Sequence, residues 1–355
     1  MSVRELTRDL VSIPSHDDEA AAGDFIEGWL RDRTDADVTR DDHGNVIAKR
    51  NTGGESLAFV GHHDVVPPDD SQIEDGEYVT AEREGRLYGR GTADMKGSVA
   101  ASMVAFRDAD PDCELQFLSF VGEEQGGLGA QAAIEDGLAP DYAVVGEGST
   151  GYSSPGTTDV AVAHKGRRGS TIAAAGTAAH ASEVEQGENA IYRASDAIEV
   201  VRDIAFPTTE VLGHELSGSV AVTEIEGGSA WNVIPERCEA TVDERTVPGE
   251  RAPIDRVERI DGVSWNVDQD LPPMACDDPA FADLVLDAAS EAQDGSPEQV
   301  VKPHATDAGW LAQAGTTCVV CGAAEPGEAH TAEESVSADV LDRCERIYRH
   351  VANAF

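Results

Sequence analysis

The sequence predicts an α/β protein with a mostly parallel, mixed sheet flanked by helices, into which a smaller α+β domain is inserted. Three observations predict this fold. In the first part of the chain, short apolar runs bounded by glycine alternate with helical segments, as they do in βαβ units. From about residue 169, apolar and polar residues alternate instead, as in half-exposed strands. After Pro272 and Pro273 the first pattern returns.

The expected elements follow in chain order. An amphipathic helix opens the chain and ends before Pro14. Buried strands are expected within residues 57–66, 115–124, 142–148 and 316–322, and helices within 97–109, 127–137 and 279–293. The insertion carries strands within 170–182 and 238–247 and a long helix within 189–204. We therefore predict one domain of residues 1–168 plus 272–355, and an inserted domain of residues 169–271.

The charge of the chain is unusual for its length. At 355 residues, two domains are the natural expectation, and the formal net charge is -42. Acidic runs are scattered along the chain and only four lysines occur. This pattern favours a halophilic surface, hydrated in concentrated salt that screens repulsion within about 3 Å, over a site for a polycation. Nucleic acid is not an expected partner, because phosphate contacts need basic patches.

Neither a membrane nor an oxidising compartment is indicated. No apolar run resembles a signal peptide or reaches the length of a membrane span, so we expect a cytoplasmic protein. The six cysteines lack the spacing of a disulfide framework. Cys318 and Cys321 form a CxxC within an apolar, strand-like run, and no second CxxC occurs. Two core thiols are therefore favoured over a zinc knuckle or a redox pair.

Histidine and carboxylate side chains follow the expected buried strands. In open α/β sheets, ligands bind beyond the carboxyl ends of the strands. A single glutamate or histidine at a strand end is usually solvated. Here, however, such residues follow several strands and meet at one edge of one sheet. The set is His62, Asp64, Asp94, Glu123, Glu124, Glu147 and His330. Two histidines and three acids from such a set are the ligands expected for zinc or a similar divalent metal. If one of the acids bridges two metal ions, the result is a two-metal hydrolytic site.

Glu123 and Glu124 need an explanation, because two adjacent carboxylates repel each other. Neighbouring residues of a strand point in opposite directions, and a turn at its tip separates them further. Glu124 can then bind a metal while Glu123 faces the substrate as the general base. Asp64, two residues after His62, is placed to hold the imidazole in one tautomer.

Six motifs occur in an order that resembles the M20 family of dizinc amidohydrolases. They are GHHDVVP, LYGRGTADMKG, VGEEQGG, VGEGS, NVIPERCEATVDER and AHTAEES, and together they span nearly the whole chain. The family includes succinyl-diaminopimelate desuccinylase, acetylornithine deacetylase, carboxypeptidases and dipeptidases. The resemblance implies a zinc-exopeptidase-like catalytic domain with an inserted lid and dimerisation domain.

The resemblance also implies a metal centre with two Zn²⁺ per chain, which Co²⁺ can replace. His62 and Glu147 would bind one zinc, Glu124 and His330 would bind the other, and Asp94 would bridge the two. In this family the metal polarises the scissile amide carbonyl and acidifies the water that attacks it. The base that takes the proton from this water would be Glu123, with Asp64 orienting His62.

Residues of the inserted domain receive roles from the resemblance as well. His180 resembles the lid histidine that reaches the site of a neighbouring subunit and stabilises the oxyanion, which implies a homodimer. Arg167, Asn232 and Arg245 resemble residues that bind the substrate carboxylate, for which an arginine fork is suited. Without the motif, His180 is an ordinary surface histidine. Arg245 and Asp243 equally suit an ion pair within a strand.

Two neighbours of the expected ligands stand outside the ligand set. His63 is not an expected ligand, because only one of two adjacent residues at a strand end faces the site. Glu334, four residues after His330, suits either an acid behind the ligands or a solvated position at the start of a helix.

The motifs leave the branch of the family open. HKGRRGS at residues 164–170 resembles the desuccinylases, whereas the loop CGAAEPGEAH has the length found in deacetylases and peptidases. The expected substrate is a small N-acyl amino acid, such as N-succinyl-diaminopimelate in lysine biosynthesis or N-acetylornithine in arginine biosynthesis. The alternatives are a carboxypeptidase or dipeptidase acting on short peptides, and a metal-binding relative without catalysis.

Overall fold

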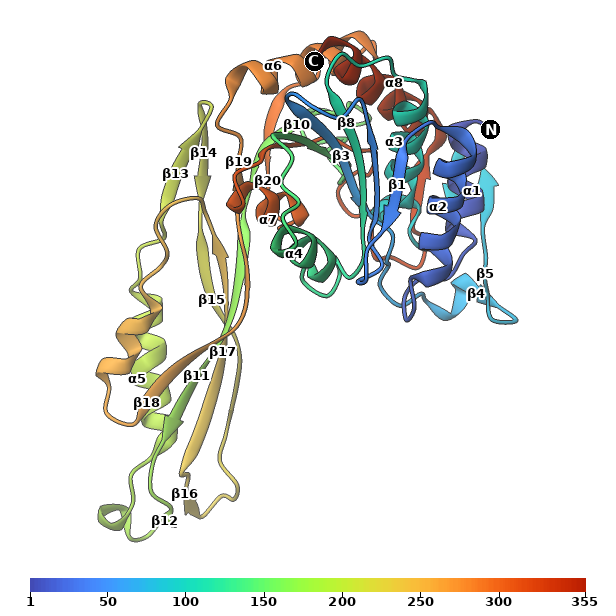
Figure 1. Cartoon of the computed structure of the whole chain (residues 1–355). Coiled ribbons are helices and arrows are strands. Elements are labelled where there is room, and N and C mark those ends of the chain that lie inside the picture. The colour runs from blue at the N-terminus through green and yellow to red at the C-terminus, as the bar shows by residue number, and fades with distance from the viewer. The chain divides into compact units, whose positions relative to one another are not determined.

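The computed structural model describes residues 1–355 and divides the chain into two compact units. The first unit consists of Met1–Ala163, Met274–Lys302 and Thr306–Phe355. The second consists of His164–Pro273 and Pro303–Ala305. Figure 1 shows the path of the chain through both units. No helix is long and apolar enough to cross a membrane.

A mixed sheet forms the centre of the first unit. Its strand order is β1-β2-β8-β3-β9-β21-β10-β19, and β20 also pairs with β10. The four inner strands β8, β3, β9 and β21 run parallel, whereas β1 with β2, β2 with β8, and β10 with β21 pair antiparallel. The strands are β1 (Asp37–Arg40), β2 (Val46–Arg50), β3 (Ser56–His62), β8 (Glu114–Phe120), β9 (Tyr142–Val145), β10 (Val160–His164), β19 (Met274–Ala275), β20 (Gln299–Lys302) and β21 (Thr317–Val320). The predicted α/β class is confirmed.

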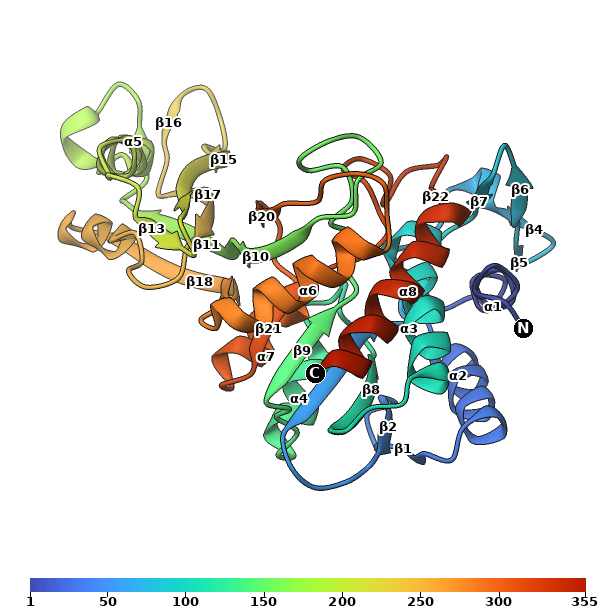
Figure 2. The ribbon, with the colours of Figure 1, turned by 90° about the horizontal axis from the view of Figure 1, so that it is seen from above.

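Helices cover both faces of this sheet, which explains why the inner strands read as unbroken apolar runs. Alternate residues of β3 and β8 point to opposite faces. Phe59 lies 5.5 Å from the Tyr348 ring and Phe117 lies 6.2 Å from the Phe106 ring, so α3 (Gly97–Asp108) and α8 (Ala338–Ala354) cover one face. Val60 and its like-facing neighbours pack against α4 (Leu128–Glu135) and α7 (Asp307–Gln313). Figure 2 shows this layering from above.

Three further helices and several short strands complete the first unit. The opening helix α1 (Val3–Val11) has a capping box formed by Ser2 and Glu5 and ends before Pro14, as expected. The other helices are α2 (Ala20–Arg33) and α6 (Pro279–Glu291). The strands β4 (Ile73–Glu74) and β5 (Glu77–Tyr78) form a short pair. A small three-stranded sheet has the order β22 (Ser335–Ser337), β7 (Arg86–Tyr88) and β6 (Ala81–Arg83). All six cysteines are free and buried, including Cys318 in β21 and Cys321 directly after it.

The second unit is built on an antiparallel sheet with the order β15-β17-β11-β18. Its long strands are β11 (Gly166–Ala175), β15 (Ser219–Gly227), β17 (Arg237–Thr246) and β18 (Val263–Leu271). The helix α5 (Ala190–Arg202) packs its alanines against Ile172 and Val242 of the sheet, which gives this unit a core of its own. Small paired strands are β12 (Ala179–His180) with β16 (Val233–Ile234), and β13 (Thr208–Val211) with β14 (His214–Ser217).

Candidate metal centre

The polar residues at the strand ends of the first unit are carried partly by turns. His62 is the last residue of β3, and Glu147 lies two residues beyond the end of β9. The expected strand containing Glu123 and Glu124 instead ends at Phe120, and both glutamates lie in the turn that follows. Gly122 and Gly127 adopt positive φ angles of 60° and 78° there. The turn, rather than the alternation of a strand, therefore directs the two carboxylates.

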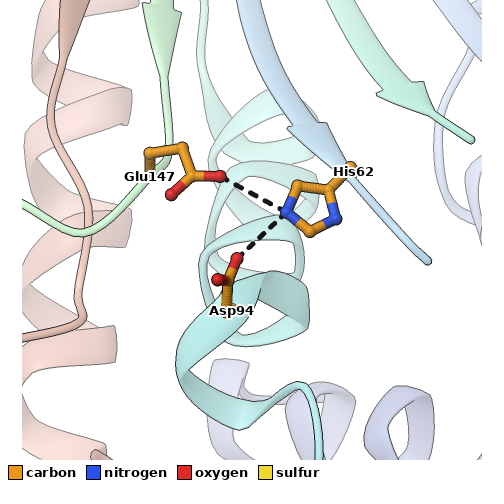
Figure 3. Close-up of side chains that lie close together, drawn as sticks. All are labelled: His62, Asp94 and Glu147. Carbon is orange, nitrogen blue, oxygen red and sulfur yellow. Dashed lines mark hydrogen bonds and ion pairs between the residues drawn. The ribbon is translucent and has the colours of Figure 1, made fainter. Parts of the chain in front are cut away.

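One group of ligand-type side chains gathers around the imidazole of His62, which is 1% exposed. Its Nε2 lies 3.0 Å from Oδ1 of Asp94 and 3.3 Å from Oε1 of Glu147 (Figure 3). Asp94 lies in the segment Thr92–Lys96 directly before α3, and its own backbone is not helical, with a φ of -128° and a ψ of 96°. Three segments far apart in the sequence thus bring one nitrogen and two oxygen atoms together.

A second group shares Asp94 with the first. Nε2 of His330 lies 3.0 Å from Oδ2 of Asp94 and 2.9 Å from Oε1 of Glu124. The His330 backbone has a positive φ of 62°, and its side chain is 49% exposed. The two oxygens of Asp94 are therefore divided between the two groups, as a bridging carboxylate requires.

The donor set fits two divalent cations. Within each group, His62-Asp94-Glu147 and Asp94-Glu124-His330, the ligand atoms lie within 4.8 Å of one another. Imidazole nitrogen and carboxylate oxygen are ligands that zinc and similar metals accept. Three half-buried or buried carboxylates at this spacing repel each other strongly unless positive charge lies between them. We conclude that these five residues suit a shared two-metal site.

The pKa values of the histidines and carboxylates in this cluster also indicate that positive charge stabilises it. Burial alone lowers the pKa of His62, but the nearby Asp64, Asp94 and Glu147 raise it well above its usual value. Hydrogen bonds that His330 donates to the carboxylates of Asp94 and Glu124 raise its pKa to about 10. Burial alone raises the pKa of Asp94, but its contacts with His330 and His62 lower this pKa well below its usual range. The carboxylates therefore favour bound cations at both positions.

Asp64 and Glu123 flank the first group without joining either one. Oδ1 of Asp64 lies 3.2 Å from Nδ1 of His62, and its Oδ2 accepts a 3.0 Å hydrogen bond from the backbone N–H of Glu124. Asp64 is thus placed to orient the imidazole, leaving Nε2 for a metal. Burial raises the pKa of Glu123 well above its usual value, and the nearby acids add to this shift. Such a carboxylate is suited to accept a proton.

Glu334 lies behind the ligands and is not a solvated residue at a helix start. Its side chain is fully buried and forms an ion pair with Arg90. Its Oε1 accepts hydrogen bonds from the backbone N–H groups of Gly91, Ala93 and Asp94, at 2.9, 3.0 and 3.3 Å. Glu334 therefore fixes the turn that carries the shared Asp94.

His63 points away from both groups. It is fully buried, and its Nδ1 lies 2.8 Å from the hydroxyl oxygen of Ser119. Burial lowers the pKa of His63 to about 3, so the ring stays neutral. The adjacent histidines thus have different surroundings: His62 lies in a group of ligand-type side chains, and His63 is packed in the interior.

Two buried ionisable residues near the site lie outside the sequence motifs. Lys302, the last residue of β20, is 4% exposed, and its Nζ lies 4.0 Å from Oε2 of Glu147. Asp307, the first residue of α7, is 3% exposed, and burial raises its pKa to about 7. The sequence could have pointed to Lys302, because a lysine at the end of an apolar strand is unusual in a chain with only four lysines.

His180 and Asn232 lie next to each other in the second unit. His180 is the last residue of β12 and lies opposite Val233 of β16. Asn232 directly precedes β16, and its backbone oxygen accepts a hydrogen bond from the backbone N–H of Ala181. His180 is exposed, and its Nδ1 lies 2.7 Å from the hydroxyl of Ser182. Its Nε2 is therefore the nitrogen left for another partner.

Arg167 and Arg245 are held by one carboxylate in the second unit. Nε of Arg167 donates to Oδ2 of Asp243, and Nε of Arg245 donates to Oδ1, both at 2.8 Å. The two arginine side chains are still 43% and 34% exposed. Arg245 thus forms the ion pair with Asp243 that its sequence allowed, and both guanidinium groups keep N–H donors for a further anion.

Sequence comparison identifies the family. The profile of peptidase family M20/M25/M40 matches residues 58–354. The chain is also 30% identical to the acetylornithine deacetylase of Myxococcus xanthus over 332 residues, which covers 85% of this chain and 82% of that protein. The protein therefore belongs to the M20 peptidase family and is a hydrolase of that family.

Solved structures agree with this fold at low sequence identity. An aminopeptidase PepT from Bacillus cereus has a TM-score of 0.81 at 18% identity, covering 99% of this chain and 97% of that one. An M20 family metallo-carboxypeptidase from Sulfolobus solfataricus has a TM-score of 0.76 at 14% identity, with 99% of both chains covered. Human carnosine dipeptidase 1 has a TM-score of 0.71 at 16% identity, covering 99% and 95%.

Proposed function

We propose that this protein is a zinc-dependent amidohydrolase that cleaves the amide bond of an N-acyl amino acid, with N-acetylornithine as the first candidate substrate. The observation that carries the proposal is the sharing of Asp94 by two ligand groups, with Glu123 beside them and outside both. The similarity to an acetylornithine deacetylase over most of the chain supports this choice over a desuccinylase.

The residues of the first unit have distinct tasks in this reaction. His62, Asp94, Glu124, Glu147 and His330 would hold two zinc ions, which supply a Lewis acid for the amide carbonyl and acidify water. Glu123 takes a proton from the attacking water and returns it to the leaving nitrogen, a task that suits its raised pKa. Asp64 keeps Nδ1 of His62 protonated, so that Nε2 remains a ligand.

The second unit supplies substrate contacts in this proposal. Arg167 and Arg245 carry exposed N–H donors that suit the carboxylate of an amino acid, and Asn232 adds a polar side chain near His180. A carboxylate-bearing substrate needs such a cationic pocket, because the net charge of -42 repels anions. Molar salt screens the rest of this repulsion.

A homodimer through the second unit completes the proposal. The strand β15 lies at an open edge of its sheet, and Ile225 on it is 56% exposed. Ile191 and Tyr192 at the start of α5 are also exposed, and Ile191 lies beside Gly228 just beyond β15. An open edge with apolar neighbours favours pairing with a second copy. His180 of each subunit then assists the oxyanion in the site of its partner.

Amine release from a panel of substrates in molar salt with Zn²⁺ or Co²⁺ tests the proposed activity. The panel contains N-acetylornithine, N-succinyl-diaminopimelate, N-acetylated neutral amino acids and dipeptides, and Glu123→Ala is the control. We expect N-acetylornithine to give the highest kcat/KM and Glu123→Ala to be inactive. Preferred cleavage of dipeptides would assign the protein to the peptidases instead, which the solved relatives make the second candidate. Hydrolysis that survives Glu123→Ala would rule out the assigned base.

A further inference from the structure

The carboxylate of Glu147 has its two oxygens in different surroundings. Oε1 faces the ligand group, 3.3 Å from Nε2 of His62. Oε2 faces the ammonium of Lys302 at 4.0 Å, which is an ion-pair distance rather than a direct hydrogen bond. The Lys302 side chain is 5% exposed and that of Glu147 is 14% exposed, so water weakens this attraction little.

We propose that Lys302 is a positioning residue that keeps Oε2 of Glu147 away from the metal, so that Glu147 binds through Oε1 alone. This inference rests on the proposed function, because it requires a metal held by His62, Asp94 and Glu147. Its consequence is that one coordination position at this metal stays open for water or the substrate carbonyl.

The chemistry of both side chains supports this role. A carboxylate can bind a metal through one or both oxygens, and a hydrolytic metal needs a position that the protein does not fill. A lysine ammonium has three N–H donors and no acceptor, so it attracts Oε2 and does not itself bind the metal. Burying an ammonium is costly unless a partner compensates it, and Glu147 is the carboxylate nearest in the first ligand group.

The same contact has a simpler interpretation, in which Lys302 only balances the negative charge of the cluster or supports the local fold. The two interpretations predict opposite changes in metal affinity. If Lys302 competes with the metal for Oε2, its removal lets Glu147 bind through both oxygens, and the metal is held more tightly. If Lys302 only supports the site, its removal disturbs Glu147 and the metal is held more loosely.

The test uses Lys302→Met, Lys302→Arg and the matched control Lys49→Met, which removes a lysine charge from β2. A His330→Ala background leaves the position formed by His62, Asp94 and Glu147. Co²⁺ affinity is measured by calorimetry and the coordination number by visible absorption, whose d–d bands weaken as ligands are added. Turnover of the best substrate is measured in the background with intact His330.

We expect Lys302→Met to bind Co²⁺ about tenfold more tightly, the lower end of effects beside metal ligands, with weaker visible bands and a kcat lower by a similar factor. Lys302→Arg and Lys49→Met should keep the spectrum of the parent protein. Looser Co²⁺ binding with an unchanged spectrum in Lys302→Met would overturn the inference. If Lys302→Met does not fold, Lys302→Gln is measured against the same two criteria. A parent protein that binds no metal would refute the proposed function itself.

Discussion

Replacing Glu334 by glutamine tests how the turn that carries Asp94 is held. Glu334 accepts three backbone N–H groups through Oε1 and pairs with Arg90 through Oε2. A glutamine keeps the size and one acceptor oxygen, so the three backbone contacts can persist. Its amide nitrogen, however, is a donor that faces the donors of Arg90.

The expected loss of stability follows from the burial of this pair. The side chains of Arg90 and Glu334 are 4% and 0% exposed. Removing one partner of a buried ion pair leaves an uncompensated charge and costs about 3–5 kcal/mol. If repulsion between the glutamine amide and Arg90 shifts the turn, Asp94 moves with it, and metal binding should weaken by about 10–100-fold, as it does on changes beside metal ligands.

Urea unfolding in molar salt, followed by circular dichroism, measures the free energy of unfolding of Glu334→Gln. The matched control is Glu333→Gln, since Glu333 pairs with Arg83 while its side chain is 79% exposed. The control should stay within about 0.5 kcal/mol of the parent protein, as surface changes usually do. A Glu334→Gln variant as stable as the control would refute the argument that this ion pair holds the turn.

Three further predictions concern the site. Glu123→Gln should lower kcat by about 10²–10⁴-fold while the bound metal, measured by elemental analysis, stays unchanged; loss of metal would contradict its place outside the ligand groups. In metal-free protein, burial raises the pKa of Asp307 to about 7 from 3.8 in the unfolded chain, so its ionisation destabilises the fold increasingly as pH rises through that window. The stability gained by Asp307→Asn should therefore be larger at about pH 8 than at about pH 5 in urea unfolding, and an equal gain at both would be evidence against this assignment. Removing metal with a chelator should lower the free energy of unfolding by about 2.7 kcal/mol, compared with protein whose free metal concentration is about a hundred times Kd. Thermal unfolding that does not change on chelation would argue against a bound metal.

Local sequence patterns predict the elements whose burial is continuous. The apolar runs that became β3, β8, β9 and β21 are buried on both faces, so their composition alone marks them as strands. The short strands β7 and β22 carry no such pattern. They exist because Arg86–Tyr88 pairs with Ser335–Ser337, a contact between distant segments that periodicity does not report.

Prediction of the site from the sequence is limited in the same way, because contacts between distant segments are not visible in it. Residue type and position at strand ends indicated His62, Glu147 and the other ligand candidates, because the carboxyl ends of parallel strands meet at one edge. The contact of Lys302 with Glu147, and the choice between the two roles that the sequence allowed for Glu334, required the fold, which places Lys302 against Glu147 and Glu334 against the turn before α3. The end of β8 was predicted too late, because Val121 extends the apolar run into the turn that carries the glutamates.

The number of metal ions bound per chain tests the central claim most directly. Calorimetric titration of the metal-free protein with Zn²⁺ should give two sites in the parent protein. His330→Ala removes the only nitrogen ligand of the second group and should leave one site, held by His62, Asp94 and Glu147. Two sites that survive His330→Ala, or a parent protein that binds a single ion, would contradict a centre in which Asp94 joins two metals.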